Sequence, residues 1–227
     1  MNANEVLSQA LILEEAGELG HAFDLFRTVT SLDPTCGRAW RHLGNLLRRS
    51  GDWGAASECF ERAIASGDDA ALNRFFLSAI GVGSVVPSPP RHFVSALFNQ
   101  YAARFEQHLV SELHYQAPEL LFRLVVGSGT RHFGNGLDLG CGTGLAAKAF
   151  QRAVTRMSGV DLSEEMLARA TACGLYERLT LSSLEEYLAS QPKGFDLVLC
   201  CDAFIYVGDL RSSFAGVREA QSFPNEV

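Results

Sequence analysis

The stretch that decides the fold is LDLGCGTG, residues 137–144. The apolar residues at its start predict a short buried strand, and LAAKAFQRAV, starting at Leu145, predicts a helix. The loop between them contains three glycines, which allow a tight turn and let the backbone approach a ligand at the helix N-terminus: Gly140, Gly142 and Gly144. The stretch therefore predicts a strand–loop–helix unit with a binding function.

Working outward from this loop, short β-rich runs alternate with helical stretches. The predicted strands are GLDL, MSGVD, LTL and FDLVLCC, and the predicted helices are LAAKAFQRAV, SEEMLARATA and SLEEYLAS. Such alternation is typical of βαβ units with helices on both faces of a parallel sheet. We therefore expect an α/β domain with an incomplete parallel sheet of about four strands.

The spacing of the glycines separates two classes of nucleotide site. The dinucleotide fingerprint G-x-G-x-x-G would require a third glycine at the position of Leu145, so a nicotinamide dehydrogenase is disfavoured. The observed G-x-G-x-G resembles motif I of the S-adenosylmethionine-dependent methyltransferases of Rossmann-like fold. Asp138 before the loop and Asp161 at the end of the next predicted strand match the order and spacing of that family.

The resemblance implies a set of cofactor-binding residues. In the family the position of Asp138 contacts the methionine end or its water network, and that of Asp161 accepts both ribose hydroxyls. Capping of the helix that begins near Ser163 is the structural alternative for Asp161. The implied set is Asp138, Gly140, Cys141, Gly142, Gly144, Asp161, Leu162, Ser183, Leu184 and Tyr101.

Ser183 departs from the family pattern. The family usually has Asp or Glu where the adenine amino group binds, and a hydroxyl accepts that hydrogen bond less strongly than a carboxylate. Ser182 and Glu185 fit an S-x-x-E capping box, which is the structural interpretation of the same segment.

Residues 93–121 precede the glycine loop and place Tyr101, Phe105, His108 and Leu109 near one helical face. An amphipathic helix packed against the sheet would explain this spacing. The sequence FNQYAARFEQHL…LHYQAPELL also resembles the stretch before motif I in bacterial methyltransferases with tetratricopeptide repeats and in the Williams–Beuren-region methyltransferase-like proteins. That resemblance implies an aromatic lid over the cofactor, from Tyr101 or Phe105, with a possible cation–π contribution to the sulfonium.

The resemblance does not identify the methyl acceptor, because enzymes of this fold methylate oxygen, nitrogen, carbon or sulfur. A general base is needed only if the acceptor must lose a proton. The segment FDLVLCCDAFIYVGDL resembles the fourth strand and the substrate-side loop of the family. Candidate bases are Asp202, Tyr206, His108 and His114, each of which could instead be structural.

The N-terminal part repeats with a period of 34 residues, pairing Leu13 with Leu47 and Phe26 with Phe60. The pattern resembles the tetratricopeptide repeat, in which small residues such as Gly44 lie between closely packed helices. Gln9 and Asp68 depart from this pattern. The segment AALNRFFLSAI resembles a partial third unit. We therefore predict a repeat domain over residues 1–80, a Pro- and Gly-rich linker over 81–90 and a methyltransferase domain over 91–227.

The composition of the chain indicates which classes of binding partner to expect. The net charge of −7 argues against nucleic acid, and no apolar run is long enough to span a membrane. The N-terminus lacks a secretory signal, and six cysteines without CxxC or zinc spacing indicate reduced thiols, a cytoplasmic location and no metal. The repeats predict a protein or peptide partner, while the oligomeric state stays open.

After the predicted helix RSSFAGVREA, the family continues with a turn and a fifth strand, but this chain reads QSFPNEV. We therefore expect a C-terminally truncated methyltransferase that keeps the cofactor-side half. The alternative function is a catalytically inactive repeat module with a partial cofactor-binding fold.

Overall fold

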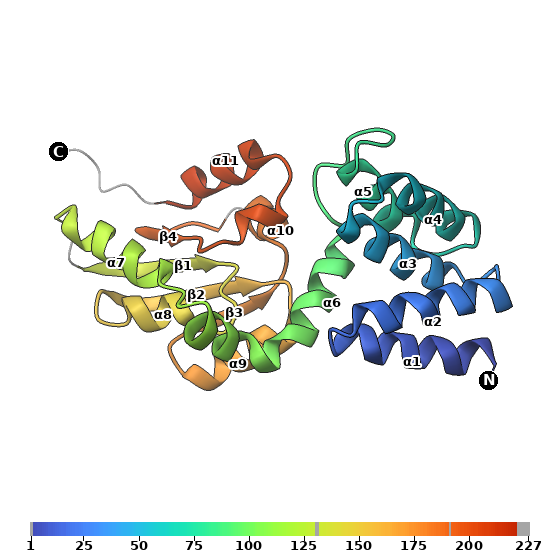
Figure 1. The fold of residues 1–227 in the computed structure, drawn as a ribbon. Coiled ribbons are helices and arrows are strands. Elements are labelled where there is room, and N and C mark those ends of the chain that lie inside the picture. The colour runs from blue at the N-terminus through green and yellow to red at the C-terminus, as the bar shows by residue number, and fades with distance from the viewer. Residues whose placement is uncertain (1, 130–131, 191, 222–227) are drawn as a thin grey trace. The chain divides into compact units, whose positions relative to one another are not determined.

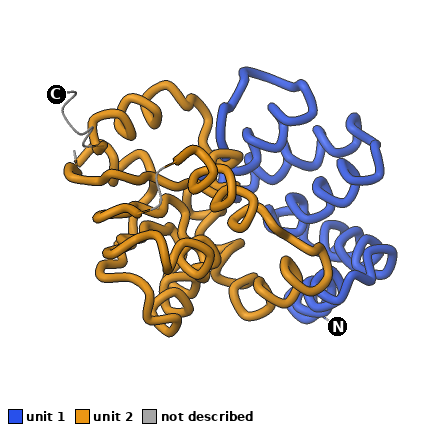
Figure 2. The backbone as a smooth tube through the Cα atoms, turned by 90° about the vertical axis from the view of Figure 1, so that its left-hand side faces the viewer, with its two compact units in different colours: residues 1–90 blue, residues 91–227 orange. Residues whose placement is uncertain are grey.

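The computed structural model describes residues 2–129, 132–190 and 192–221. The chain divides into two compact units, residues 1–90 (unit 1) and 91–227 (unit 2), which are coloured separately in Figure 2. The segment predicted as a linker, residues 81–90, is the last part of unit 1. No helix in the described part of the chain is long and apolar enough to cross a membrane.

Unit 1 contains helices only, in the part described. They are α1 (Ala3–Glu15), α2 (Leu19–Leu32), α3 (Gly37–Ser50), α4 (Trp53–Ala65) and α5 (Ala70–Ala79). Helix α1 packs on α2, α2 on α3, α3 on α4 and α4 on α5, so each helix contacts its neighbours in sequence (Figure 1).

The 34-residue period has a direct counterpart in the backbone. Glu18 N–H donates to the Leu13 carbonyl at the end of α1, and Asp52 N–H donates to the Leu47 carbonyl at the end of α3. Both turns contain a left-handed glycine, Gly17 at φ +82° and Gly51 at φ +86°, a conformation that favours glycine. The two helical hairpins therefore turn in the same way at the same repeat position.

Close packing within the second hairpin depends on Gly44. A Cβ on Gly44 would lie 2.8 Å from Cε1 of Phe60, so only glycine permits this approach of α3 to α4. Phe26 and Phe60 are fully buried, as expected for side chains that fill the space between helices.

Unit 2 is built on a four-stranded parallel sheet with the order β3-β2-β1-β4 in the described residues. Its strands are β1 (Phe133–Leu139), β2 (Val154–Asp161), β3 (Arg178–Leu181) and β4 (Leu197–Leu199), and its α-helices are α6 (Arg91–Tyr101), α7 (Ala117–Gly127), α8 (Leu145–Phe150), α9 (Glu164–Cys173), α10 (Leu184–Ala189) and α11 (Leu210–Ala220). The register pairs Phe133 with Val154 on one side of β1 and Gly136 with Leu197 on the other.

Helices cover both faces of this sheet, as predicted. One core joins Phe150, Met157 and Leu199 with α7 and α8, and the other joins Leu137 and Leu188 with α10 and α11 (Figure 1). The predicted four strands and parallel alternation are confirmed, and the fold is Rossmann-like.

Several boundaries differ from the predictions. Strands β1 and β2 begin at Phe133 and Val154, three residues before the predicted runs GLDL and MSGVD. The helix expected over residues 145–154 ends at Phe150, because Val154 instead pairs in β2 opposite Phe133. The fourth strand is only Leu197–Leu199 rather than residues 195–201. The segment 93–121 is not one amphipathic helix: α6 is followed by a 3₁₀ turn (Ala102–Arg104), a π-helix (Gln107–Glu112) and then α7.

Candidate functional site: a glycine loop covered by an aromatic segment

The glycine loop follows β1 at the carboxyl edge of the sheet. Gly140, Gly142 and Gly144 all have positive φ, +71°, +54° and +95°, which other residues rarely adopt. A Cβ on Gly140 would also lie 2.3 Å from the Cβ of Ala203, so this position admits only glycine. Because β2 and β4 lie on opposite sides of β1, the loop is at the topological switch point where open α/β sheets bind ligands.

Asp161, the last residue of β2, holds this loop in place. Its Oδ2 accepts the Gly142 N–H at 2.8 Å, and its Oδ1 accepts the Ser163 N–H at 2.9 Å. Burial raises the pKa of Asp161, while these backbone donors act in the opposite direction. Each carboxylate oxygen can accept two hydrogen bonds, so acceptor capacity remains for a ligand hydroxyl.

The capping alternative for this segment is resolved by the contacts. Ser163 itself is the N-cap of α9, and its Oγ accepts the Met166 N–H at 3.1 Å. Asp161 therefore supports the cap residue and the glycine loop, rather than capping the helix directly.

Asp138 is buried beneath the loop. Its Oδ2 accepts the Tyr176 hydroxyl at 2.7 Å, and its Oδ1 has no hydrogen-bond partner among the described residues. Burial raises the pKa of Asp138 to about 7; the negative charge of Asp161 acts in the same direction and the Tyr176 hydrogen bond opposes it. Cys141 in the loop is buried too, and burial raises the pKa of its thiol well above the usual range, which keeps it protonated and inert.

Ser183 is the N-cap of α10, which corrects the predicted register of the capping box. Its Oγ accepts the Glu186 N–H at 3.2 Å, whereas Ser182 donates to the Ser183 carbonyl and caps nothing. Ser183 and Leu184 are buried, while Leu162 is partly exposed.

Residues 91–116, which we call the covering segment, are attached to the glycine-loop region by polar contacts. Asn99 Oδ1 on α6 accepts the Ser163 hydroxyl at 2.6 Å. Lys148 of α8 donates to both carboxylate oxygens of Glu106 at 2.8 and 3.0 Å. Burial acts to raise the pKa of Glu106, but the contacts with Lys148 hold this pKa below its usual range. Arg91 forms an ion pair with Glu186 of α10. The covering segment thus contacts α8, α9 and α10.

One aromatic ring of this segment, that of Phe105, lies next to the loop. The Phe105 ring lies 3.8 Å from the position of a Cβ on Gly142, and the Tyr101 ring packs edge-on against Phe105 with centroids 5.2 Å apart. The Tyr101 hydroxyl and His108 Nδ1 are hydrogen-bonded to each other. Tyr101, Phe105 and His108 are therefore brought together, with Phe105 next to the loop.

The residues after β4 form the other side of the site. Asp202 has a left-handed backbone (φ +60°), and its Oδ2 accepts the Tyr115 hydroxyl at 2.5 Å. Burial, with the charge of Asp202, raises the pKa of Tyr115, which keeps this donor protonated. Tyr206 packs edge-on against Phe98 of α6 with centroids 5.2 Å apart, and His114 is exposed.

Sequence reasoning missed Tyr115 and Tyr176, the two tyrosines that donate to the carboxylates. Tyr115 belongs to the quoted stretch LHYQAPELL, but its partner is 87 positions away, so no local spacing indicates the pair. In the described part of the chain, no group of three His, Cys, Asp or Glu side chains is arranged to hold a metal ion.

Comparisons with known proteins find similarity to methyltransferases. Residues 137–221 match the family described as "Methyltransferase domain". Human methyltransferase-like protein 27 is 36% identical over 110 residues, covering 47% of this chain and 44% of that protein. The ubiquinone biosynthesis O-methyltransferase of Thiobacillus denitrificans is 38% identical over 84 residues, covering 35% of this chain and 36% of that protein. Among solved structures, a DhpI–SAH complex superimposes with a TM-score of 0.49 at 24% identity, covering 58% of this chain and 64% of that one.

This chain thus spans less than half the length of the curated relatives named above. The residues present nevertheless fit the cofactor of the family: the three glycines adopt the positive φ that this loop requires, Asp161 has acceptor capacity left, and a buried oxygen of Asp138 has no partner in the described structure. Residues 137–221 of unit 2 are therefore similar to a methyltransferase domain, and the sheet of unit 2 has a Rossmann-like topology.

Proposed function

We propose that unit 2 binds S-adenosylmethionine at the glycine loop and transfers its methyl group to a hydroxyl oxygen. The observation that carries the proposal is the hydrogen bond from Gly142 N–H to Asp161, because it fixes the glycine turn and the ribose acceptor relative to each other before binding. An oxygen acceptor is supported by the O-methyltransferases among the relatives.

The chain would supply positioning and the exclusion of water. Asp161 would accept the ribose hydroxyls, the free oxygen of Asp138 would accept a donor from the methionine end, and Phe105 rather than Tyr101 would cover the cofactor. When bound, S-adenosylmethionine supplies an electrophilic methyl group on a positively charged sulfur, which an aromatic ring stabilises. Ser183 is a weaker candidate for the adenine amine, because its Oγ already accepts the Glu186 N–H.

A hydroxyl acceptor must lose its proton as the methyl group is transferred, and two groups could take it. Asp202 and His108 each have a hydrogen bond to a tyrosine, Tyr115 and Tyr101, which orients them. Asp202 is the better candidate, because it follows β4 at the carboxyl edge of the sheet and its second oxygen is not occupied by Tyr115.

Calorimetric titration of the full chain with S-adenosylmethionine tests the cofactor site. We expect micromolar to submillimolar affinity, a loss of roughly tenfold in Phe105→Ala and a larger loss in Asp161→Asn. Leu124→Ala, which removes a side chain that is 72% exposed on α7, is the matched control and should leave binding unchanged. Affinity weaker than millimolar in the wild type, or equal losses in all three variants, would refute the site.

The chemistry is tested by release of S-adenosylhomocysteine in the presence of a panel of phenols, carboxylic acids, amines and thiols. Activity with phenols or carboxylic acids supports oxygen as the acceptor, and activity confined to amines or thiols refutes it. In this assay Asp202→Asn should lower turnover without weakening cofactor binding, since it alters only the acceptor side.

For unit 1 we propose a tetratricopeptide array that binds a protein or peptide partner. Support comes from the 34-residue repeat of the turns at Gly17 and Gly51 and from the packing of Gly44 against Phe60. The acidic net charge argues against nucleic acid as that partner, and a cytoplasmic location remains a prediction from the sequence.

A further inference from the structure

Tyr115 and Asp202 form a contact between two segments that are far apart in the chain. Tyr115 lies near the end of the covering segment and Asp202 follows β4, yet the Tyr115 hydroxyl donates to Asp202 Oδ2 at 2.5 Å. Burial raises the pKa of Tyr115, so this hydroxyl stays a neutral donor. The contact therefore joins the segment that covers the glycine loop to the candidate base.

The backbone is unusual at both ends of this contact. His114, directly before Tyr115, has φ +51° and Asp202 has φ +60°, and these are the two residues other than glycine with positive φ in the part of the chain that the structure describes. This conformation costs free energy in a residue with a Cβ, and it persists where the surrounding structure requires it. The Tyr115 N–H donates to the Leu109 carbonyl at 2.9 Å, so the turn at His114 is attached to the preceding π-helix. The strained backbone thus lies where the chain directs these two side chains toward each other.

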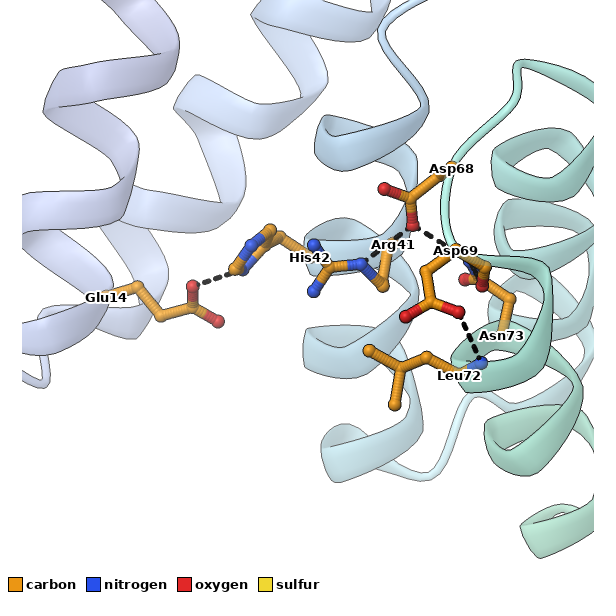
Figure 3. Close-up of polar contacts among 7 residues, drawn as sticks. All are labelled: Glu14, Arg41, His42, Asp68, Asp69, Leu72 and Asn73. Atoms are coloured by element: carbon orange, nitrogen blue, oxygen red, sulfur yellow. Dashed lines mark hydrogen bonds and ion pairs between the residues drawn. The ribbon is translucent and has the colours of Figure 1, made fainter. Parts of the chain in front are cut away.

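Asp202 also differs from a carboxylate such as Asp68 in the kind of partner it has. In unit 1, Arg41 Nε donates to Asp68 Oδ2 at 2.7 Å, and Figure 3 shows the two side chains directed at each other. Asp202 has a hydroxyl as its partner instead, and neither residues 105–116 nor residues 197–210 contain lysine or arginine. A cation would neutralise the charge that a proton acceptor needs, whereas a hydroxyl orients the carboxylate and leaves its charge in place.

We propose that Tyr115 is a positioning residue for the methyl transfer, which holds Oδ2 of Asp202 so that Oδ1 takes the proton of the acceptor. This inference rests on the proposed function and adds the residue that orients its base. In the transfer step the acceptor oxygen forms the new C–O bond, the bond between the methyl carbon and sulfur breaks with its electron pair going to sulfur, and the acceptor proton moves to Oδ1 of Asp202. Because Phe105 and Tyr115 belong to the same covering segment, the segment that covers the glycine loop also orients the base.

The test is a double-mutant cycle in the full chain: wild type, Tyr115→Phe, Asp202→Asn and the double variant. Release of S-adenosylhomocysteine is measured with the phenol or carboxylic acid on which the wild type acts fastest. Tyr115→Phe keeps the ring and removes only the hydroxyl, so we expect a roughly tenfold lower kcat with an unchanged KM for S-adenosylmethionine. In the Asp202→Asn background the same substitution should change kcat less than about twofold, because the group that Tyr115 positions is no longer a base.

Tyr187→Phe is the matched control, because it removes a tyrosine hydroxyl from α10, outside the site, and should leave kcat unchanged. Equal factors of loss from Tyr115→Phe in the two backgrounds, or no loss in the wild-type background, would overturn the inference while the proposed function stands. No turnover with any phenol or carboxylic acid would overturn both.

A second measurement does not depend on the folding of the Tyr115→Phe variant. The protein has five tyrosines, which can be labelled with ¹³C at the ring carbon that bears the hydroxyl and observed by NMR. Asp202→Asn should move the signal of the tyrosine that donates to Asp202, whereas Glu219→Gln on the exposed surface of α11 should move none. Five signals that are unaffected by Asp202→Asn would overturn the inference.

Discussion

Asp138 contributes to the dependence of the stability of unit 2 on pH. Its carboxyl is 1% exposed, and burial raises its pKa to about 7 from an ordinary value of 3.8. Because the folded pKa is the higher one, the folded state binds an extra proton between pH 3.8 and 7. This contribution to stability is therefore complete below pH 3.8 and is lost as the pH rises through 7.

The magnitude follows from the gap between the two pKa values. The gap is about three pH units, and at about 1.4 kcal/mol per unit the loss is about 4 kcal/mol by pH 8. Asp138→Asn removes the charge but places an amide N–H₂ where Oδ1 has no partner in the described structure, at a cost of about 1–3 kcal/mol. We therefore expect Asp138→Asn to stabilise unit 2 by about 1–3 kcal/mol at pH 8 and to destabilise it at pH 4.

Urea unfolding followed by circular dichroism measures this change. Tryptophan emission reports only on unit 1, because both tryptophans, Trp40 and Trp53, lie there, so the two transitions can be separated. Tyr176→Phe should shift the loss of stability to higher pH, since the Tyr176 hydroxyl lowers the pKa of Asp138. Glu219→Gln, on the exposed surface of α11, is the control and should keep the wild-type pH dependence.

Burial raises the pKa of Asp161 as well, so the wild-type slope contains a second contribution of the same sign. The difference between wild type and Asp138→Asn isolates Asp138. The reasoning fails if that difference is the same at pH 4 and pH 8, or if the wild-type stability of unit 2 rises between pH 5 and 7.

Two further predictions concern packing. Gly44→Ala should destabilise unit 1 by about 1–3 kcal/mol, because its Cβ would meet the Phe60 ring at 2.8 Å. Gly54→Ala lies at a helical position with no atom within 4 Å of the new Cβ, so it should stabilise unit 1 by up to about 1 kcal/mol. Urea unfolding followed by tryptophan emission measures both changes. Phe150→Ala should destabilise unit 2 by about 3–5 kcal/mol, as measured by circular dichroism, because the fully buried ring packs edge-on against Phe122 at 5.3 Å.

The sequence predicted the sheet of unit 2 well because its signals are local. Each strand is a short apolar run, and the turn after β1 requires glycines in sequence, so strand order along the chain and the position of the loop follow directly. The end of α8 was placed too late, since the helical pattern continues through Val154, whose pairing with Phe133 decides the boundary. The covering segment changes from an α-helix to a 3₁₀ turn and a π-helix. The sequence does not indicate this change, because no glycine or proline lies between Arg91 and Gln116.

The sequence indicated candidate residues for the site but not the pairs that they form. Motif spacing identified Asp138 and Asp161, yet their protonation depends on burial and on Tyr176, which is 38 positions from Asp138. The two buried carboxylates differ in the hydrogen bonds that they accept. Asp161 accepts from the backbone N–H groups of Gly142 and Ser163. Asp138 accepts from one hydroxyl, and its other oxygen has no partner in the described structure. A buried acceptor without a donor costs free energy in the absence of ligand and would regain it when a ligand supplies the donor. Asp138→Asn places an amide N–H₂ at this position, which cannot accept a hydrogen bond from a ligand donor. The stabilisation of unit 2 by S-adenosylmethionine should therefore be smaller in that variant than in the wild type.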